Sequence, residues 1–152
     1  MVIRPLQKQD EEAVRDLIFF ILDEEFSVEQ KAYPVTDLDA IEKHYRGPRD
    51  IFLVAVEDHR VIGTAAVKED DAKTALLRRI FVDPSYRGKR FGSQLVDRAL
   101  AFCREKGYKR VAFRGTSSME KALALMRRKG FVEKERIRFG EVEMIHFNLT
   151  LT

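Results

Sequence analysis

Residues 87–93 form a short basic segment with the residue types best suited to bind a phosphate group. The segment reads Arg-Gly-Lys-Arg-Phe-Gly-Ser and lies between an apolar run and an amphipathic stretch. This order predicts a strand, a turn and a helix start, where backbone N–H groups point outward without internal partners. Three cations and the helix dipole add positive charge, and two glycines let a ligand approach the backbone. We therefore expect a phosphate or pyrophosphate site; an ordinary basic turn is the alternative.

The residues on both sides of this segment extend the pattern. The run Leu-Arg-Arg-Ile-Phe-Val-Asp-Pro precedes it at 77–84, and Lys-Gly-Phe follows at 129–131, after a short strand and a helix. Together they resemble the GCN5-related N-acetyltransferase (GNAT) superfamily, whose motif is Gln/Arg-x-x-Gly-x-Gly/Ala. Arg87 and Gly92 match this motif, whereas Arg90 stands where the middle glycine is usual. That departure is modest if Arg90 keeps a negative φ angle.

The resemblance implies that acetyl-coenzyme A (acetyl-CoA) binds along the turn and the strand before it. The residues expected to hold its diphosphate are Arg87, Gly88, Lys89, Arg90, Phe91, Gly92 and Ser93. The backbone of Ile80, Phe81 and Val82 would pair with the pantetheine arm. Ser117 and Phe131 would lie along the cofactor path. Helix capping also explains Ser117, and a buried aromatic at a strand start also explains Phe131.

The family's usual positions for the proton acceptor and the proton donor hold apolar residues here. A glutamate is common near position 76 and a tyrosine at position 126, where this chain has Leu76 and Met126. A thioether cannot donate a proton. The catalytic residues thus stay unknown, and His146, Glu143 and Glu24 are the weak candidates. A surface strand equally explains His146, and a solvated helix end equally explains Glu24.

The remaining sequence predicts the elements that position the turn. Strands are expected at 2–6, 51–56, 61–67, 75–82, 110–114, 132–138 and 145–151. Helices are expected after Asp10, after Thr36, after the turn, and after Ser117, which would form a capping box with Glu120. The class is α+β. The resemblance implies a mixed, mostly antiparallel sheet of about seven strands, flanked by about four helices and splayed between strands four and five.

Composition narrows the class of protein. The 152 residues with a single cysteine, Cys103, indicate one domain over 1–152 without an internal disulfide. No apolar run is long enough for a membrane span and the N-terminus is not a signal peptide, so we expect a cytoplasmic protein. The three histidines show no metal-ligand spacing, and we expect no metal site. The net charge of +3 comes from dispersed cations, which argues against nucleic acid as a partner.

The leading hypothesis is an N-acetyltransferase that moves an acetyl group from acetyl-CoA to a primary amine, by direct attack in a ternary complex. A non-catalytic acyl-CoA-binding regulatory or sensor module is the second, favoured by Leu76 and Met126. A nucleic-acid-binding domain is the third, suggested only by the basic charge. The resemblance places the acceptor, a small-molecule or peptide amine, on segment 20–45 and the last hairpin, and it allows a homodimer.

Overall fold

The computed structural model describes residues 1–28 and 35–152. The predicted acceptor segment 20–45 therefore includes six residues, 29–34, that lie outside the described part. The strands are β1 (Val2–Pro5), β2 (Ile51–Glu57), β3 (Arg60–Glu69), β4 (Thr74–Val82), β5 (Arg110–Thr116), β6 (Val132–Phe139) and β7 (Val142–Thr150). The helices are α1 (Glu11–Glu25), α2 (Ile41–His44), α3 (Phe91–Glu105) and α4 (Glu120–Arg128), with short 3-10 helices η1 (Lys8–Asp10), η3 (Thr36–Ala40) and η4 (Pro84–Tyr86).

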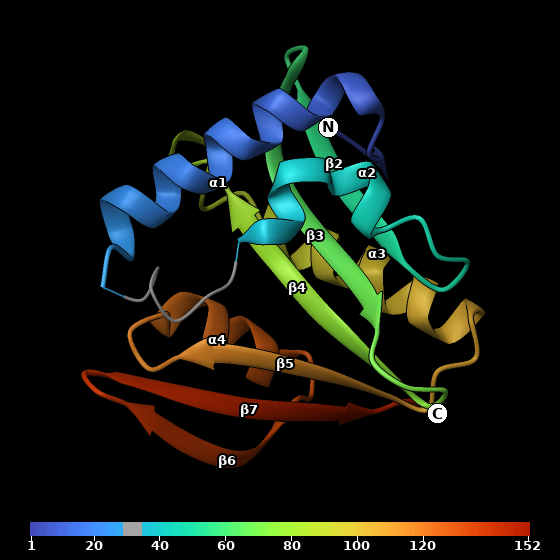
Figure 1. The fold of residues 1–152 in the computed structure, drawn as a ribbon, viewed down its shortest axis with the longest axis vertical. Coiled ribbons are helices and arrows are strands. Elements are labelled where there is room, and N and C mark those ends of the chain that lie inside the picture. The colour runs from blue at the N-terminus through green and yellow to red at the C-terminus, as the bar shows by residue number, and fades with distance from the viewer. Residues whose placement is uncertain (29–34) are drawn as a thin grey trace.

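The seven strands form one mixed sheet in the order β1-β2-β3-β4-β5-β7-β6. All neighbours are antiparallel except β4 and β5, which pair in parallel over only four residues each, 74–77 with 110–113. Beyond Leu77 and Phe113 the two strands diverge and split the sheet (Figure 1). The predicted α+β class and the splay between strands four and five are confirmed.

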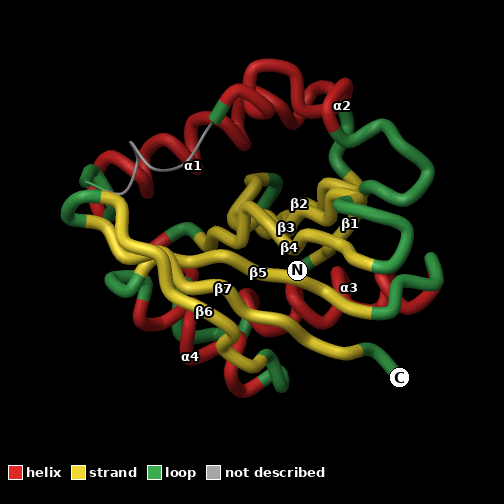
Figure 2. Tube along the Cα trace, turned by 60° about the horizontal axis from the view of Figure 1, so that its bottom comes forward, coloured by secondary structure: helices red, strands yellow, loops and turns green. Residues whose placement is uncertain are grey.

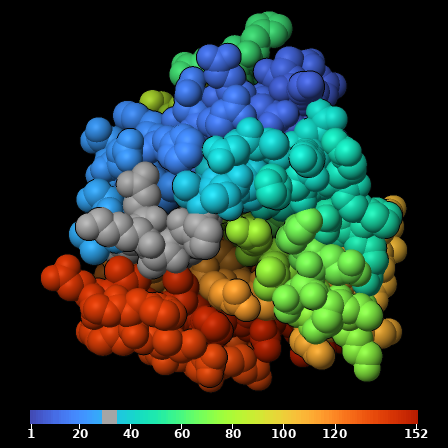
Figure 3. Space-filling view, viewed as in Figure 1, coloured from blue at the N-terminus to red at the C-terminus, as the bar shows by residue number. Residues whose placement is uncertain are grey.

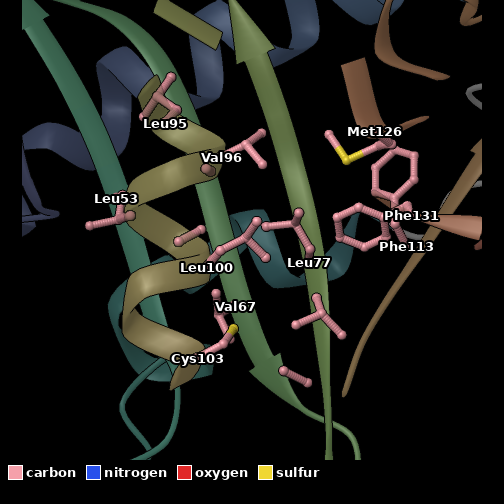
Figure 4. Close-up of a cluster of buried hydrophobic side chains, with 14 of the residues drawn as sticks. Leu53, Val67, Leu77, Leu95, Val96, Leu100, Cys103, Phe113, Met126 and Phe131 are labelled. Carbon is pink, nitrogen blue, oxygen red and sulfur yellow. The ribbon is translucent and has the colours of Figure 1, made fainter. Parts of the chain in front are cut away.

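Helices cover both faces of the sheet (Figure 2). We call the side of α1 and α2 the α1 face, and the side of α3 and α4 the α3 face. On the α1 face, Val14, Ile18 and Leu22 pack with residues of η3 and α2 against β2 and β3. On the α3 face, Leu95, Val96, Ala99, Leu100 and Cys103 are buried against the central strands (Figure 4).

The buried residues of each long helix form a single stripe, because apolar residues at helical spacing lie on one side of a helix. Cys103 is fully buried on the inner side of α3, and burial raises the pKa of its thiol to about 12. The sulfur is therefore a small core group, protonated at neutral pH.

The predicted capping box before α4 is wrong. The helix begins at Glu120 with Met119 as its N-cap residue, and no side chain caps it. The backbone N–H of Ser117 instead donates to the carbonyl oxygen of Glu143, 3.0 Å away. Strand pairing between β5 and β7 thus continues through Ser117 and delays the start of the helix.

The cap expected from Asp10 is also formed differently. Asp10 stands at the N-cap position of α1 but makes no side-chain bond to that helix. Its carboxylate instead accepts hydrogen bonds from the Gln7 backbone, 2.7 Å away, and from both terminal nitrogens of Arg4. Asp10 thus forms an ion pair with Arg4 of β1 and does not cap the helix.

Candidate active site

A cavity of about 1080 Å³, the main cavity, opens where β4 and β5 diverge. Its walls come from β4 between Leu76 and Val82, the basic turn, the start of α4 and the last turn of α1. Figure 3 shows a hollow on this side of the molecule, between α2 above and the β6–β7 hairpin below. The split in the sheet therefore creates a passage from the basic turn to the α1 face.

The basic turn at 87–93 presents the start of α3 to this cavity. Asp83 holds the turn, since its carboxylate accepts from the backbone N–H of Ser85 at 2.9 Å. The first hydrogen bond inside α3 runs from the Gln94 N–H to the Arg90 carbonyl, 3.1 Å away. The N–H groups of residues 91–93 consequently have no acceptor within the helix. Such groups, together with the helix dipole, favour an anion.

Arg90 adopts a conformation that the sequence pattern did not predict. Its φ angle is +65°, in the left-handed region, so the expectation of a negative φ is wrong. Gly88, two residues earlier, has φ of +82°. A left-handed conformation costs a side-chain-bearing residue about 1 kcal/mol. This position therefore requires the geometry that the family's usual glycine would adopt, and the arginine accepts the strain.

Most of the predicted cofactor residues line the main cavity: Ile80, Phe81, Val82, Arg87, Gly88, Arg90, Phe91, Gly92 and Ser93. Lys89 does not, and its ammonium group lies 5.4 Å from the centre of the Tyr86 ring. Ser117 is absent from the lining, although its neighbour Ser118 is part of it. Phe131 is buried beside Met126 in the core (Figure 4).

Arg87 connects the turn to α1. Its Nη1 lies 2.8 Å from the carboxylate of Glu25, and its Nε donates to the carbonyl oxygen of Val82 at 3.1 Å. Both charged side chains are about 30% exposed, at 31% and 30%, so the ion pair is accessible to solvent. A bound diphosphate would have to compete with Glu25 for this guanidinium.

A β-bulge interrupts β4 at the edge of the main cavity. Thr64 and Ala66 of β3 face Phe81 and Arg78 of β4, so β4 carries one extra residue at this point. Arg79 lies in the bulge with φ of +56°. The Thr64 hydroxyl donates to the Arg79 carbonyl at 2.6 Å and fixes the bulged backbone.

A buried ion pair holds the side chain of Arg79. Its Nε lies 3.1 Å from Oδ2 of Asp37 in η3, and its Nη2 contacts the other carboxylate oxygen. The Tyr45 hydroxyl donates to Asp37 at 2.8 Å. Burial alone would raise the pKa of Asp37, but Arg79, Tyr45 and Arg78 together hold it below its usual value. The carboxylate therefore stays charged and ties η3 to the bulge.

The weak catalytic candidates lie apart from one another. Glu143 accepts a hydrogen bond from Arg136 at 2.8 Å, and Glu24 is exposed on α1; neither lines the main cavity. His146 lines a second, polar cavity of about 250 Å³, the small cavity, which shares Ala112, Phe113 and Arg114 with the main one. Its Nδ1 lies 3.4 Å from the Glu135 carboxylate.

The two apolar positions noted in the sequence differ in their surroundings. Leu76 lines the main cavity, whereas Met126 is fully buried in the core of the α3 face. Among the described residues, no group of three or more His, Cys, Asp or Glu side chains could hold a metal ion. Nor does any helix of the described residues have the length and apolar character needed to cross a membrane.

Comparison with solved structures finds the same fold. A GNAT-family acetyltransferase from Staphylococcus aureus Mu50 shares 22% identity and superimposes with a TM-score of 0.86 over 99% of both chains. The protein yncA from Salmonella typhimurium, solved with its cofactor acetyl-CoA, shares 21% identity with a TM-score of 0.83. That match covers 100% of this chain and 94% of the other.

The sequence itself matches relatives over part of their length. N-acetylaspartate synthetase from Danio rerio is 36% identical over 89 residues, which are 57% of this chain and 31% of the relative. The camello protein of Xenopus tropicalis, a probable N-acetyltransferase by name, is 33% identical over 104 residues. These are 66% of this chain and 47% of that protein, so the matched segments span less than half of these relatives.

The family model described as Acetyltransferase (GNAT) family matches residues 15–131, more than half of the chain. This range contains most of α1, the bulged strand β4, the basic turn and both helices of the α3 face. The resemblance inferred from the turn is therefore confirmed, and the chain belongs to the GNAT family of acetyltransferases.

Proposed function

We propose that this protein is an N-acetyltransferase that moves the acetyl group of acetyl-CoA to a primary amine. The observation that carries the proposal is the continuous main cavity, which joins the basic turn at 87–93 to the gap between β4 and β5. The turn offers helix N–H groups and cations for a diphosphate. Membership of the family, and the acetyl-CoA bound to the related Salmonella protein, support the same ligand here.

The proposed reaction is a direct attack in a ternary complex. The amine nitrogen attacks the carbonyl carbon of the thioester, a C–N bond forms, and the C–S bond breaks. The sulfur leaves as a thiolate, while the proton of the amine passes to water. Cys103, the one cysteine, is buried and its thiol has a raised pKa, which speaks against an acyl-cysteine intermediate.

Positioning would supply most of the rate enhancement in this scheme. Leu76, at the family's usual position for the proton acceptor, is apolar and lines the main cavity. Met126, at the usual position for the proton donor, is enclosed in the core. Holding the two reactants in a near-attack geometry contributes about 7–11 kcal/mol in well-oriented systems. His146, Glu143 and Glu24 stay candidates for proton transfer. A cytoplasmic location and a single domain over 1–152 also stay predictions.

The test combines binding and turnover. An added Cβ at Gly92 would meet only ordinary contacts, at 3.6 Å from Val82 and 3.7 Å from Leu125. Gly92→Glu therefore places bulk and negative charge at the start of α3 without an unavoidable clash at the backbone. We expect about 100-fold weaker acetyl-CoA binding by calorimetry, because like charges at a binding site cost several kcal/mol.

Ala101→Glu is the matched control, since it adds the same charge on the exposed side of the same helix. The control should bind acetyl-CoA as the unchanged protein does. Release of free thiol with a panel of amines then measures turnover. Equal affinity of both variants and the unchanged protein would contradict the placement of the diphosphate.

A second candidate is an acyl-CoA-binding module without turnover. The apolar Leu76 in the wall of the main cavity is the observation that favours it. Tight binding of acetyl-CoA with no thiol release from any amine would select this function over the enzyme.

A further inference from the structure

We infer that the amine acceptor carries a carboxylate, as a free amino acid does, and that Arg78 and Arg114 bind it. This inference rests on the proposed acetyl transfer. The last parallel pairs of β4 and β5 are Leu76 with Ala112 and Leu77 with Phe113. Arg78 and Arg114 are the next residue on each strand. They therefore follow the last paired residues of the two strands, at the point where the pairing of β4 and β5 ends.

Arg78 and Arg114 both lie on the α1 face of the sheet, next to the gap between β4 and β5. Leu77 and Phe113 are buried in the core of the α3 face, and side chains alternate along a strand. Arg78 and Arg114 thus belong to the α1 face, and both line the main cavity. The Arg78 side chain is 32% exposed, and Arg114 is an exposed residue. The pair is accessible to a small molecule that enters from this face.

The charges around the pair favour an anion. The described lining of the main cavity contains seven Lys or Arg residues against two carboxylates, Glu25 and Glu120. Glu25 pairs with Arg87 at the other end of the cavity. Asp37 approaches Arg78 only to 4.0 Å, and its oxygens already accept bonds from Arg79 and Tyr45.

The neighbouring small cavity extends the same polar surface. Its lining includes Arg110, His146 and Asn148, together with two acidic residues, Asp70 and Asp71. The Asp71 carboxylate accepts from the backbone N–H groups of Lys73 and Thr74, at 2.8 Å each. A carboxylate bound between Arg78 and Arg114 would form charge-assisted hydrogen bonds with both guanidinium groups.

The spacing suits a small amino acid. Arg78 precedes Ile80, where the pantetheine arm is expected, by two residues. Two residues of regular strand would span about 7 Å, and the bulge at Arg79 shortens this distance. An arginine side chain covers most of this distance. A molecule whose amine and carboxylate are separated by one or two carbons could therefore place its nitrogen at the thioester and its carboxylate at the arginines. A polyamine would bring further positive charge to the same place.

The experiment measures thiol release with aspartate, glutamate and alanine. Each amino acid is compared with the derivative in which every carboxylate is replaced by a carboxamide, and a diamine and a polyamine are also tested. We expect the amino acids to be acetylated and the carboxamides and polyamines to react at least 10-fold more slowly at equal concentration. Arg78→Gln and Arg114→Gln should each raise the KM for the amino acid about 10- to 100-fold, as loss of a charge-assisted hydrogen bond does. The KM for acetyl-CoA should not change.

Two further variants separate binding from folding. Arg78→Lys keeps the charge and should recover part of the affinity, whereas Arg104→Gln, on an exposed position of α3, should leave both KM values unchanged. The inference is wrong, while the proposed function stands, if carboxamides or polyamines react as fast as amino acids, or if Arg78→Gln leaves the KM for the amino acid unchanged. If no amine yields thiol, the proposed function fails and this inference fails with it.

Discussion

Replacement of Asp37 by asparagine should reveal how strongly the buried ion pair holds the bulge of β4. The side chains of Asp37 and Arg79 are only 10% and 5% exposed. The change leaves shape nearly intact but removes the charge that compensates the guanidinium. Loss of one partner from a buried pair costs about 3–5 kcal/mol. We expect the free energy of unfolding to fall by about 3 kcal/mol at pH 7, since the amide still accepts hydrogen bonds.

The pH dependence of this loss identifies its cause. The pKa of Asp37 in the folded protein is lowered, so its contribution is complete above the unfolded value of about 3.9 and disappears as the pH falls through the folded value. At that pH the carboxyl is protonated and resembles the amide. The difference between the two proteins should therefore be largest at neutral pH and shrink below pH 4.

Urea denaturation followed by circular dichroism, at several pH values from 7 downward, measures both effects. Glu42→Gln removes an exposed charge from the adjacent helix α2 and serves as the control, with an expected change under about 0.5 kcal/mol. A loss below about 1 kcal/mol at pH 7 for Asp37→Asn, or a loss that stays constant down to pH 3, would refute the reasoning.

Two substitutions test local geometry. Arg90→Gly should raise the free energy of unfolding by up to about 1 kcal/mol, because glycine adopts the φ of +65° without strain; an unchanged or lower urea midpoint would contradict this. Met126→Tyr should lower the free energy of unfolding by about 1–3 kcal/mol, because Met126 is fully buried and a larger side chain has to displace its core neighbours. A variant that melts normally and turns over faster would instead mean that position 126 reaches the thioester.

The sequence was sufficient to predict those elements whose structure depends on apolar periodicity and on the residues of a turn. The inner side of α3 was predicted from helical spacing, because an amphipathic helix must bury a single stripe. The strands predicted at 51–56 and 61–67 leave only a short polar connection between them, and they form the hairpin of β2 and β3. Its two turn residues, Asp58 and His59, have φ of +52° and +63°, as a two-residue hairpin turn requires.

Long-range contacts could not be read from the chain in the same way. Asp37 and Arg79 are 42 residues apart, and local pattern contains no information on which carboxylate meets which cation. The signal for an unusual site was nevertheless present, since two adjacent arginines interrupt the apolar run of β4. Two arginines in a strand of apolar residues indicate a buried partner or a ligand.

Local rules failed where two of them competed. Ser117 fits a helix cap by its spacing from Glu120, but strand pairing with β7 takes the same backbone group. Arg90 has a residue type that favours negative φ, yet the turn geometry imposes the left-handed conformation. The phosphate site at 87–93 was predicted from residue types alone, whereas the identity of the cofactor and the pairing of residues 80–82 with it could be proposed only because the motif around Gly92 resembles a known family.

The burial of Cys103 simplifies the chemistry of any turnover assay. Reagents that report free coenzyme A react with thiolates, and the protein's own sulfur is enclosed by core side chains with a pKa of about 12. The native protein should therefore contribute almost no background colour on the timescale of the reaction. For the same reason, a single cysteine introduced on the surface could be labelled selectively without first replacing the natural one.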